Sequence, residues 1–120
     1  MAWRVVEVLG YAYYVSKGYR ILHPLVEAHG YDFVAEKNGE FVRVNVKQAY
    51  KRQMGSTPSW CISMAGKSNV PTHPAVDVFL AYIPTVGRFI ELPGDFFEGV
   101  SGRSRRIPVA ATKHLEEENG

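Results

Sequence analysis

A carboxylate, an amide and an ammonium group stand on two segments that flank an Asn-Gly pair. Asp32 lies in the first segment, residues 31–36, and Asn45 and Lys47 lie in the second, residues 40–50. Asn-Gly between two runs rich in branched and aromatic residues predicts a tight β-hairpin. Because a hairpin brings the start of one arm beside the end of the other, we expect Asp32 to lie near Asn45 and Lys47.

These three side chains have the chemistry needed to hold a hard divalent cation. Mg²⁺ takes few protein oxygens and completes its octahedral shell with water and phosphate oxygens. Asp32 and Asn45 each offer such an oxygen. A lysine beside the cation can position or deprotonate a water, or neutralise charge that builds on a phosphorus centre. The pattern predicts metal-dependent phosphoryl chemistry, although a hairpin that contains an aspartate and a lysine is more often only structural.

The second arm must present its polar residues on one side. Side chains alternate along a strand, so Arg43, Asn45 and Lys47 are expected on one face and the intervening valines on the face toward the core. Residues 3–16 predict a helix with a stripe of small and aliphatic residues, and the domain's own sheet is expected to cover one side of this helix. The stripe consists of Val5, Val8, Leu9, Ala12 and Val15. The opposite side of the helix carries Trp3, Glu7, Tyr11 and Tyr14 and is also largely apolar, so a second cover is expected, such as another subunit.

The remaining elements are predicted mostly as strands. Residues 19–26, 60–66, 76–84 and 88–93 are rich in branched and aromatic residues, and the run 76–84 is typical of a buried central strand. Residues 51–59 predict a basic loop or the start of a helical turn, and 67–74 a loop. The segment 94–120 is expected to be basic and partly irregular. The order favours one α+β domain, residues 1–120, with a mixed sheet and an N-terminal helix.

Composition is ordinary for a globular protein. The chain has 120 residues, 46% of them hydrophobic and 22% charged, with no apolar run of the ~20 residues that a membrane helix needs. A single cysteine, Cys61, cannot form an internal disulfide and is expected to be a small core residue. No membrane partner and an intracellular location are therefore expected.

The positive charges are clustered although the net charge is only +2. From Phe41 to Val76 there are five cations and no acid, and three arginines lie close together at 103–106. Such clusters are typical of a surface that binds a phosphate backbone, and they also occur in solvated loops. Single-strand binding by base stacking is less well supported, because most tyrosines fall on the predicted helix and strands rather than beside the cations.

Two stretches carry a family resemblance that covers roughly Trp3 to Pro93. "GYRILHPLVEAHGYDFVAEKNGEFVRVNVKQA" followed by "VDVFLAYIPTVGRFIELP" resembles the PD-(D/E)xK nuclease superfamily, in particular its group I intron homing endonucleases and their Holliday-junction-resolvase relatives. The resemblance implies a restriction-endonuclease-like core. It also implies a site made of a helix-borne Glu, an Asp, a Glu or Gln, and a Lys. By position these are Glu7, Asp32, Asn45 and Lys47, with the first three as metal ligands; Asp77 receives no catalytic role.

This sequence departs from the family pattern at two positions. The proline that precedes the aspartate in the family name is absent, since Gly30 and Tyr31 precede Asp32. Asn45 is shorter than the family's Gln or Glu by one methylene and is neutral, so it is expected to hold Mg²⁺ less strongly than a carboxylate would and to weaken activity.

The resemblance implies a Mg²⁺-dependent DNA endonuclease, with Mn²⁺ as a substitute, that cuts double-stranded DNA, most simply a site-specific homing-type enzyme. Two alternatives stay open: a Holliday-junction-resolvase-like enzyme and a non-catalytic DNA-binding remnant of the fold. A homodimer or homotetramer is expected, because one small domain spans only a short duplex. Expected DNA contacts are the basic residues Arg43, Lys51, Arg52, Lys67, Arg103, Arg105 and Arg106. His23 either approaches the scissile phosphate or is an ordinary strand residue.

Overall fold

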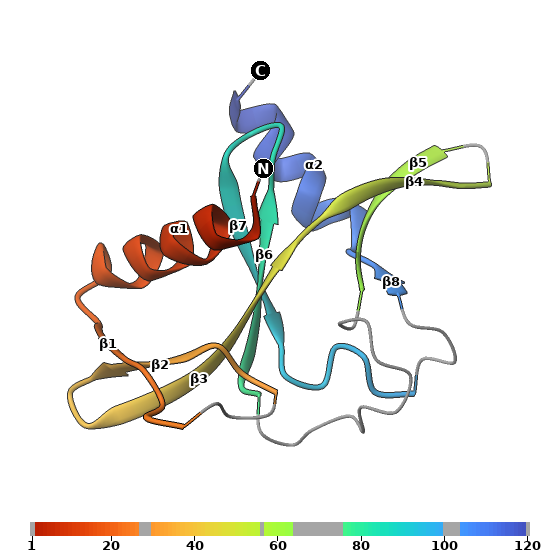
Figure 1. Cartoon of the computed structure of the whole chain (residues 1–120). Coiled ribbons are helices and arrows are strands. Elements are labelled where there is room, and N and C mark those ends of the chain that lie inside the picture. Colours follow the sequence, from red (N-terminus) through yellow and green to blue (C-terminus); the bar gives the residue numbers. More distant parts are fainter. Residues whose placement is uncertain (1, 27–29, 56, 64–75, 100–103, 120) are drawn as a thin grey trace.

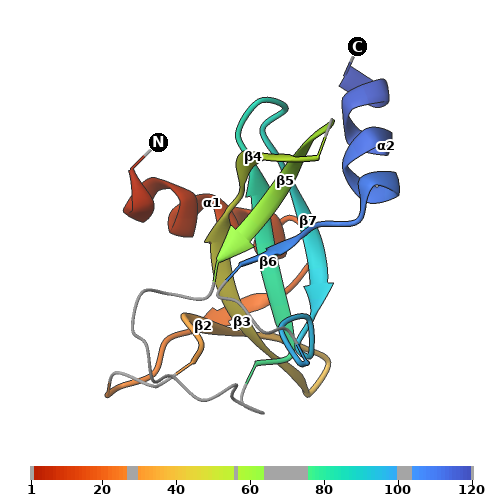
Figure 2. The same cartoon turned by 90° about the vertical axis from the view of Figure 1, so that its right-hand side faces the viewer.

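The computed structural model describes residues 2–26, 30–55, 57–63, 76–99 and 104–119. The described chain forms two helices and eight strands arranged in two sheets (Figures 1 and 2). In chain order the elements are α1 (Trp3–Val15), β1 (Arg20–Leu22), β2 (Phe33–Lys37), β3 (Glu40–Gln48), β4 (Tyr50–Met54), β5 (Thr57–Ser63), β6 (Val78–Ile83), β7 (Arg88–Pro93), β8 (Ser104–Arg106) and α2 (Val109–Asn119). The predicted α+β class with an N-terminal helix is confirmed.

The larger sheet is mixed. Its strand order is β1-β2-β3-β6-β7, with β3 and β6 parallel and every other pair antiparallel. The run predicted as a buried central strand is β6, which lies inside the sheet and is buried from Leu80 to Ile83. Two interior strands rich in branched residues therefore form the middle of the sheet, and the longer of them, β3, carries Asn45 and Lys47.

The hairpin between β2 and β3 has the geometry that Asn-Gly predicts. Asn38 and Gly39 both have positive φ angles, 54° and 81°, as a type I′ turn requires. This turn fixes the register, with Lys37 opposite Glu40 and Phe33 opposite Val44. The hairpin prediction is confirmed, and with it the position of Asp32 next to the far half of β3.

Helix α1 covers one face of the larger sheet, and the smaller sheet β4-β5-β8 covers the other together with α2 (Figure 2). Under α1 the core contains Val44, Val46 and Leu80. On the opposite face the core contains Trp60 and Ile62 of β5. Since neighbours on β3 point to opposite faces, Asn45 and Lys47 point away from α1, toward the side of the smaller sheet.

Helix α1 does not turn the valines of its aliphatic stripe toward the sheet. Val5, Val8 and Val15 are about half exposed, whereas the buried positions are Val6, Gly10 and Tyr14. The reason is close approach of the helix to the sheet. A Cβ on Gly10 would lie 3.1 Å from Cγ2 of Val46, so the missing side chain lets α1 pack tightly on β3. Counting apolar side chains could not reveal this contact, because it is made by the residue that has none.

Residues 51–59 are not the predicted loop or helical turn. They form most of a second hairpin, in which β4 pairs antiparallel with β5 and Met54 lies opposite Thr57. Polar residues along β4 concealed the strand, because its outer face is exposed and pairing with the apolar β5 stabilises it. The segment after Gly94 is also more regular than expected, since it contains β8 and α2. The predicted loop at 67–74, and the end of the predicted strand at 64–66, lie outside the described residues.

Neither described helix is long and apolar enough to cross a membrane.

Candidate active site

The predicted site residues lie at the edge of the larger sheet where β3 extends beyond the first residue of β2. The last pair of the β2-β3 ladder is Phe33 with Val44, so the part of β3 from Asn45 to Gln48 has no strand on its β2 side. Asp32, the residue just before β2, fills the start of this gap. Backbone groups that a neighbouring strand would otherwise satisfy are therefore available to side chains and ligands.

Asp32 is held in the gap by two hydrogen bonds on either side of Asn45. Its backbone N–H donates to the carbonyl oxygen of Val44 at 2.8 Å. Its Oδ2 accepts from the backbone N–H of Val46 at 2.6 Å. Burial raises the pKa of the Asp32 carboxyl, the hydrogen bond from Val46 opposes the rise, and the nearby charge of Glu7 adds to it.

The side chain of Asn45 is oriented by one hydrogen bond and leaves one oxygen without a partner. Nδ2 donates to the carbonyl oxygen of Gly30 at 3.0 Å. Oδ1 is buried and has no hydrogen-bond partner within the described structure. A buried carbonyl oxygen without a donor costs free energy unless something binds it. Oδ1 is therefore the oxygen of this residue that is free to accept a ligand.

Lys47 lies two residues further along β3 and is nearly inaccessible, with 9% of its surface exposed. Burial lowers the pKa of its ammonium group, and the carboxylate of Asp32 opposes this effect. The two charges thus act on each other. A lysine that is desolvated and faces a carboxylate is suited to proton transfer or to stabilising negative charge.

Glu7 reaches the same region from α1. The hydroxyl of Tyr11, one helical turn further along, donates to its Oε1 at 2.5 Å. Burial raises the pKa of the Tyr11 phenol, and the hydrogen bond and charge of Glu7 and the charge of Asp32 raise it further. The charge of Glu7 therefore raises the pKa of the Asp32 carboxyl, and the charge of Lys47 lowers it. Tyr11 follows Glu7 by four residues on the helix, the spacing that brings two side chains together, and the sequence already favours a bond between this acid and a tyrosine hydroxyl.

The donor set is suitable for a hard divalent ion, although it is poor in charge. The described residues contain no group of three acidic, histidine or cysteine side chains able to hold a metal, so Asp32 and Glu7, whose charges interact, could supply at most two carboxylates. The free Oδ1 of Asn45 is the natural third oxygen. A site with so few protein oxygens is better suited to Mg²⁺, which keeps several water ligands, than to Ca²⁺ or Zn²⁺.

Replacing Asp32 with Asn is expected to stabilise the metal-free protein at pH 7 by about 1 kcal/mol. Because folding raises the pKa of this carboxyl, its contribution to stability is complete below the unfolded-state pKa of about 3.9 and is lost as pH rises through the folded-state pKa. The stability difference between Asp32→Asn and the parent should therefore shrink as pH falls from 7 toward 4. Urea unfolding in EDTA measures it, with Asp95→Asn at an exposed turn as the control. A variant less stable than the parent at pH 7 contradicts the prediction.

Two other candidates have identifiable partners. His23 is exposed and lies edge-on to the ring of Tyr11, with 5.0 Å between ring centroids, so it borders the site without a hydrogen bond to the acids. Asp77 forms a two-pronged ion pair with Arg43, at 3.0 and 3.1 Å, and also accepts from the Arg43 backbone N–H. This ion pair ties the start of β6 to β3 and partly neutralises Arg43.

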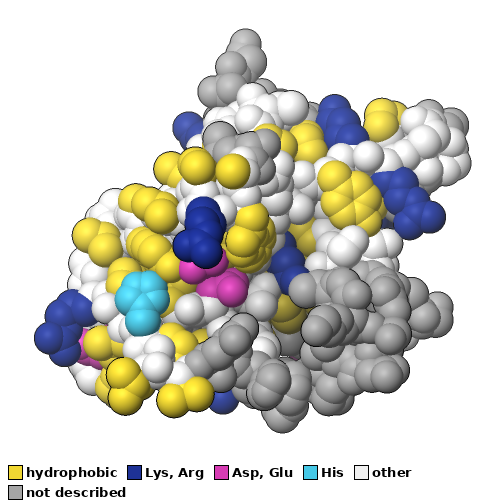
Figure 3. Space-filling model, in the orientation of Figure 1, with side chains coloured by type: hydrophobic (Ala, Val, Ile, Leu, Met, Phe, Trp, Pro, Cys, Tyr) yellow, Lys and Arg dark blue, Asp and Glu magenta, His cyan; other side chains and the backbone are white. Residues whose placement is uncertain are grey.

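The remaining cations predicted to meet DNA gather on the smaller sheet. Lys51 and Arg52 lie on β4 and Arg105 and Arg106 on β8, while Lys67 and Arg103 lie outside the described residues. Figure 3 shows acidic side chains near the middle of the face that carries α1, beside a cation and a histidine, and further cations over β4 and β5 at its right.

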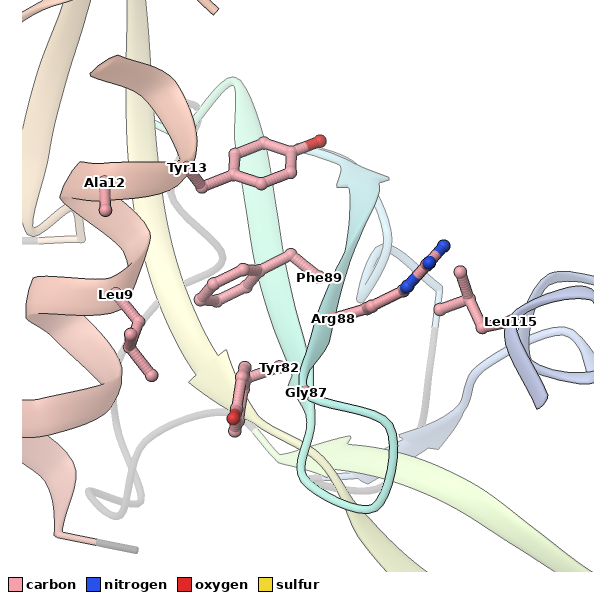
Figure 4. Close-up of a pocket in the computed structure, with 8 residues that line it drawn as sticks. All are labelled: Leu9, Ala12, Tyr13, Tyr82, Gly87, Arg88, Phe89 and Leu115. Carbon is pink, nitrogen blue, oxygen red and sulfur yellow. The ribbon is translucent and has the colours of Figure 1, made fainter. Parts of the chain in front are cut away.

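A separate open groove of about 480 Å³ lies between α1, β7 and α2 (Figure 4). It is lined by Leu9, Ala12, Tyr13, Tyr82, Gly87, Arg88, Phe89 and Leu115. None of the predicted site residues contributes to it. The groove is mainly apolar, so it is unsuited to phosphate and is not the candidate active site.

A helix-borne acid, an aspartate at a strand start and an amide-x-lysine pair on the next strand are the arrangement that the sequence resemblance implies for a PD-(D/E)XK nuclease. The chain belongs to the PD-(D/E)XK endonuclease family, whose model matches residues 5–117. Among solved structures it is similar to the bacterial homing endonuclease I-Ssp6803I, with a TM-score of 0.67 and 21% identity over 88% of this chain and 71% of that chain. At this identity the likeness shows the fold. No curated protein sequence matches the chain.

Proposed function

We propose that the protein is a Mg²⁺-dependent endonuclease that cuts phosphodiester bonds of double-stranded DNA at specific sites, as a homing-type enzyme does. The observation that carries the metal dependence is the buried Oδ1 of Asn45, which has no donor within the described structure and belongs to a residue flanked by the two hydrogen bonds of Asp32 to Val44 and Val46. Family membership supports the nuclease activity, and the similarity in fold to a bacterial homing endonuclease supports a homing-type role.

We assign each of the four site residues a role from its position. Asp32 and Asn45 would hold the ion, with Glu7 at its far side. When bound, the ion would stabilise the charge that develops on the phosphate. Lys47 is placed to orient the attacking water, to accept its proton, or to stabilise the transition state. Tyr11 fixes the orientation of the Glu7 carboxylate through its 2.5 Å hydrogen bond.

The direct test uses a plasmid library with random inserts of about 30 base pairs, roughly three turns of B-DNA, so that a long target is covered. Incubation with Mg²⁺ or Mn²⁺ should cut a small subset of plasmids at a shared motif, and EDTA should prevent it. Sequencing of the new ends gives the target. Cutting of four-way junctions in preference to linear duplex would favour a resolvase-like enzyme. DNA binding without cleavage, by both the parent and Asn45→Gln, would favour the non-catalytic alternative.

We further propose that the exposed side of α1 is a subunit interface in a homodimer or homotetramer. One active site cuts one strand, so a double-strand break needs at least two sites on the same duplex. Trp3, Val5, Val8 and Val15 are 46–58% exposed on α1, and this apolar surface continues into the groove of Figure 4 through Leu9 and Ala12. An apolar patch of this kind is typical of an interface.

Val8→Glu is therefore expected to dissociate the oligomer, because it places a charge in the middle of this patch. Sedimentation velocity at micromolar concentration should show the parent as a dimer or tetramer and Val8→Glu as a monomer. Val109→Glu, at a valine on α2 that is about half exposed, is the matched control and should leave the oligomer intact. A parent that sediments as a monomer contradicts the proposal.

A further inference from the structure

The smaller sheet has two faces that the sequence could not distinguish. Paired residues of neighbouring strands share a face, so Lys51, Trp60, Ile62 and Arg105 lie together on one side. Trp60 and Ile62 belong to the core, so this is the inner face. The ammonium of Lys51 lies over the Trp60 ring at 5.3 Å. Arg105 stacks on the ring of Phe96 at 4.8 Å and donates to the Phe96 carbonyl oxygen.

The outer face carries the other two cations among hydroxyl groups. Tyr50, Cys61 and Arg106 form one row across the three strands, and Arg52 lies in the next row. The guanidinium of Arg52 donates to Oγ of Ser104 at 3.2 Å, and the hydroxyl of Tyr50 lies 2.9 Å from Oγ of Ser63. Both Arg52 and Arg106 lie on the face that carries the buried Cys61, and the charges of both lower the pKa of its thiol, against the effect of burial.

Within the described part of the chain, the two arginines of this face have no acidic partner. The ion pairs of the described residues involve Lys17, Arg20 and Arg43 and not Arg52 or Arg106. The sequence contains no acid between Phe41 and Val76, nor between Gly99 and Leu115. Two exposed guanidiniums that lie beside hydroxyl groups and have no acidic partner among the described residues fit a partner that offers both negative charge and hydrogen-bonding edges.

The shape of this unit fits a duplex. The β4-β5 hairpin extends away from the larger sheet (Figure 1). Two or three strands at about 4.8 Å spacing are roughly 5 to 10 Å wide, and the major groove of B-DNA is about 12 Å wide and admits a β-ribbon. There arginine binds guanine through two parallel hydrogen bonds, and hydroxyl groups bind several bases.

We propose that the outer face of β4-β5-β8 enters the major groove of the DNA substrate and reads its sequence, with Arg52 and Arg106 as base-reading residues and Tyr50, Ser63 and Ser104 as supporting donors and acceptors. The inner-face cations Lys51 and Arg105 stabilise the sheet and contribute only charge. This assignment rests on the proposed function for the identity of the ligand. It goes beyond that function because it assigns adjacent cations different roles. Arg52 and Arg106 would read the DNA sequence, whereas their neighbours Lys51 and Arg105 would not.

The test measures binding separately from cleavage. In a Lys47→Ala background, a pool of random-sequence duplexes is bound in Mg²⁺ and the bound fraction is sequenced. Arg52→Lys and Arg106→Lys keep the charge but lose the two-pronged geometry. Each is expected to reduce the preference at one base position by about 10-fold, with little change in the salt dependence of binding. Lys51→Met, on the same strand and the opposite face, should keep the full motif and lower only the salt dependence.

Several outcomes overturn the proposal. These are retention of the full motif by both arginine variants, loss of the motif in Lys51→Met, absence of any enriched motif, and equal competition by single-stranded DNA or RNA. Thermal melting shows whether each arginine variant is folded. If one of them is unfolded, the binding data of the other, on the other strand, test the proposal. Binding of a motif by a parent that cuts nothing would refute the proposed catalysis and leave the reading face supported.

Discussion

Lys47→Ala is expected to lower the rate of DNA cleavage by about 10³-fold while DNA binding persists. The ammonium is buried and faces Asp32, so its removal takes away the group best placed to handle the proton or the developing charge. Single-turnover cleavage at saturating enzyme measures the rate, and gel shift of the same duplex measures binding. Lys37→Ala, on the adjacent strand with its ammonium on a backbone carbonyl, should cleave like the parent.

The stability of the Lys47 variants separates a chemical role from a structural one. Lys47→Met keeps the length of the side chain and relieves the burial of the ammonium, but it leaves the buried Asp32 carboxylate without its neighbouring cation, so some loss of stability is expected. The variant should therefore unfold at a lower urea concentration than the parent, remain folded in water, and still fail to cleave. Full activity in Lys47→Met would remove Lys47 from the mechanism. Loss of folding together with activity would mean that its role is in packing.

Gly94→Ala is expected to destabilise the protein by about 3 kcal/mol or more, which is a large share of the stability of a small domain. A Cβ at this position would lie 2.0 Å from the carbonyl oxygen of Val76 and 3.0 Å from its carbonyl carbon. Both atoms belong to the backbone, so a rotamer change cannot relieve the clash. The chain leaving β7 crosses the start of β6 here, next to the Asp77–Arg43 ion pair.

Gly55→Ala provides the control, because its added Cβ meets nothing within 4 Å and only its positive φ of 67° is unfavourable. It should cost about 1 kcal/mol. Urea unfolding followed by circular dichroism gives both free energies. A loss for Gly94→Ala no larger than that for Gly55→Ala would show that the two strands separate easily at this crossing.

Much of the candidate site follows from local sequence. Asn-Gly requires positive φ at both turn residues, and once that turn exists, the alternation of β3 sets Asn45 and Lys47 on one face and the valines on the other. The register also fixes Asp32 beside Asn45. These are short-range consequences, so the sequence determined them, together with the α+β class and the interior position of β6.

Other features depend on contacts between distant segments. α1 turns Val6, Gly10 and Tyr14 inward, and the missing side chain of Gly10 lets the helix approach Val46 closely; no stripe of apolar residues predicts that choice. β4 is a strand because β5 pairs with it, although its own residues are polar.

Tertiary structure also decided which charges face one another. The packing of α1 brought the charge of Glu7 near Asp32, and the pairing of β3 with β6 allowed Arg43 to form an ion pair with Asp77. The formation of β4 placed Lys51 and Arg52 on opposite faces of one strand. The sequence alone determined the hairpin that carries the chemistry, because a turn and an alternating strand are local. Only the packing of two sheets decided what that chemistry faces, because burial and charge partners are set by residues that are far apart along the chain.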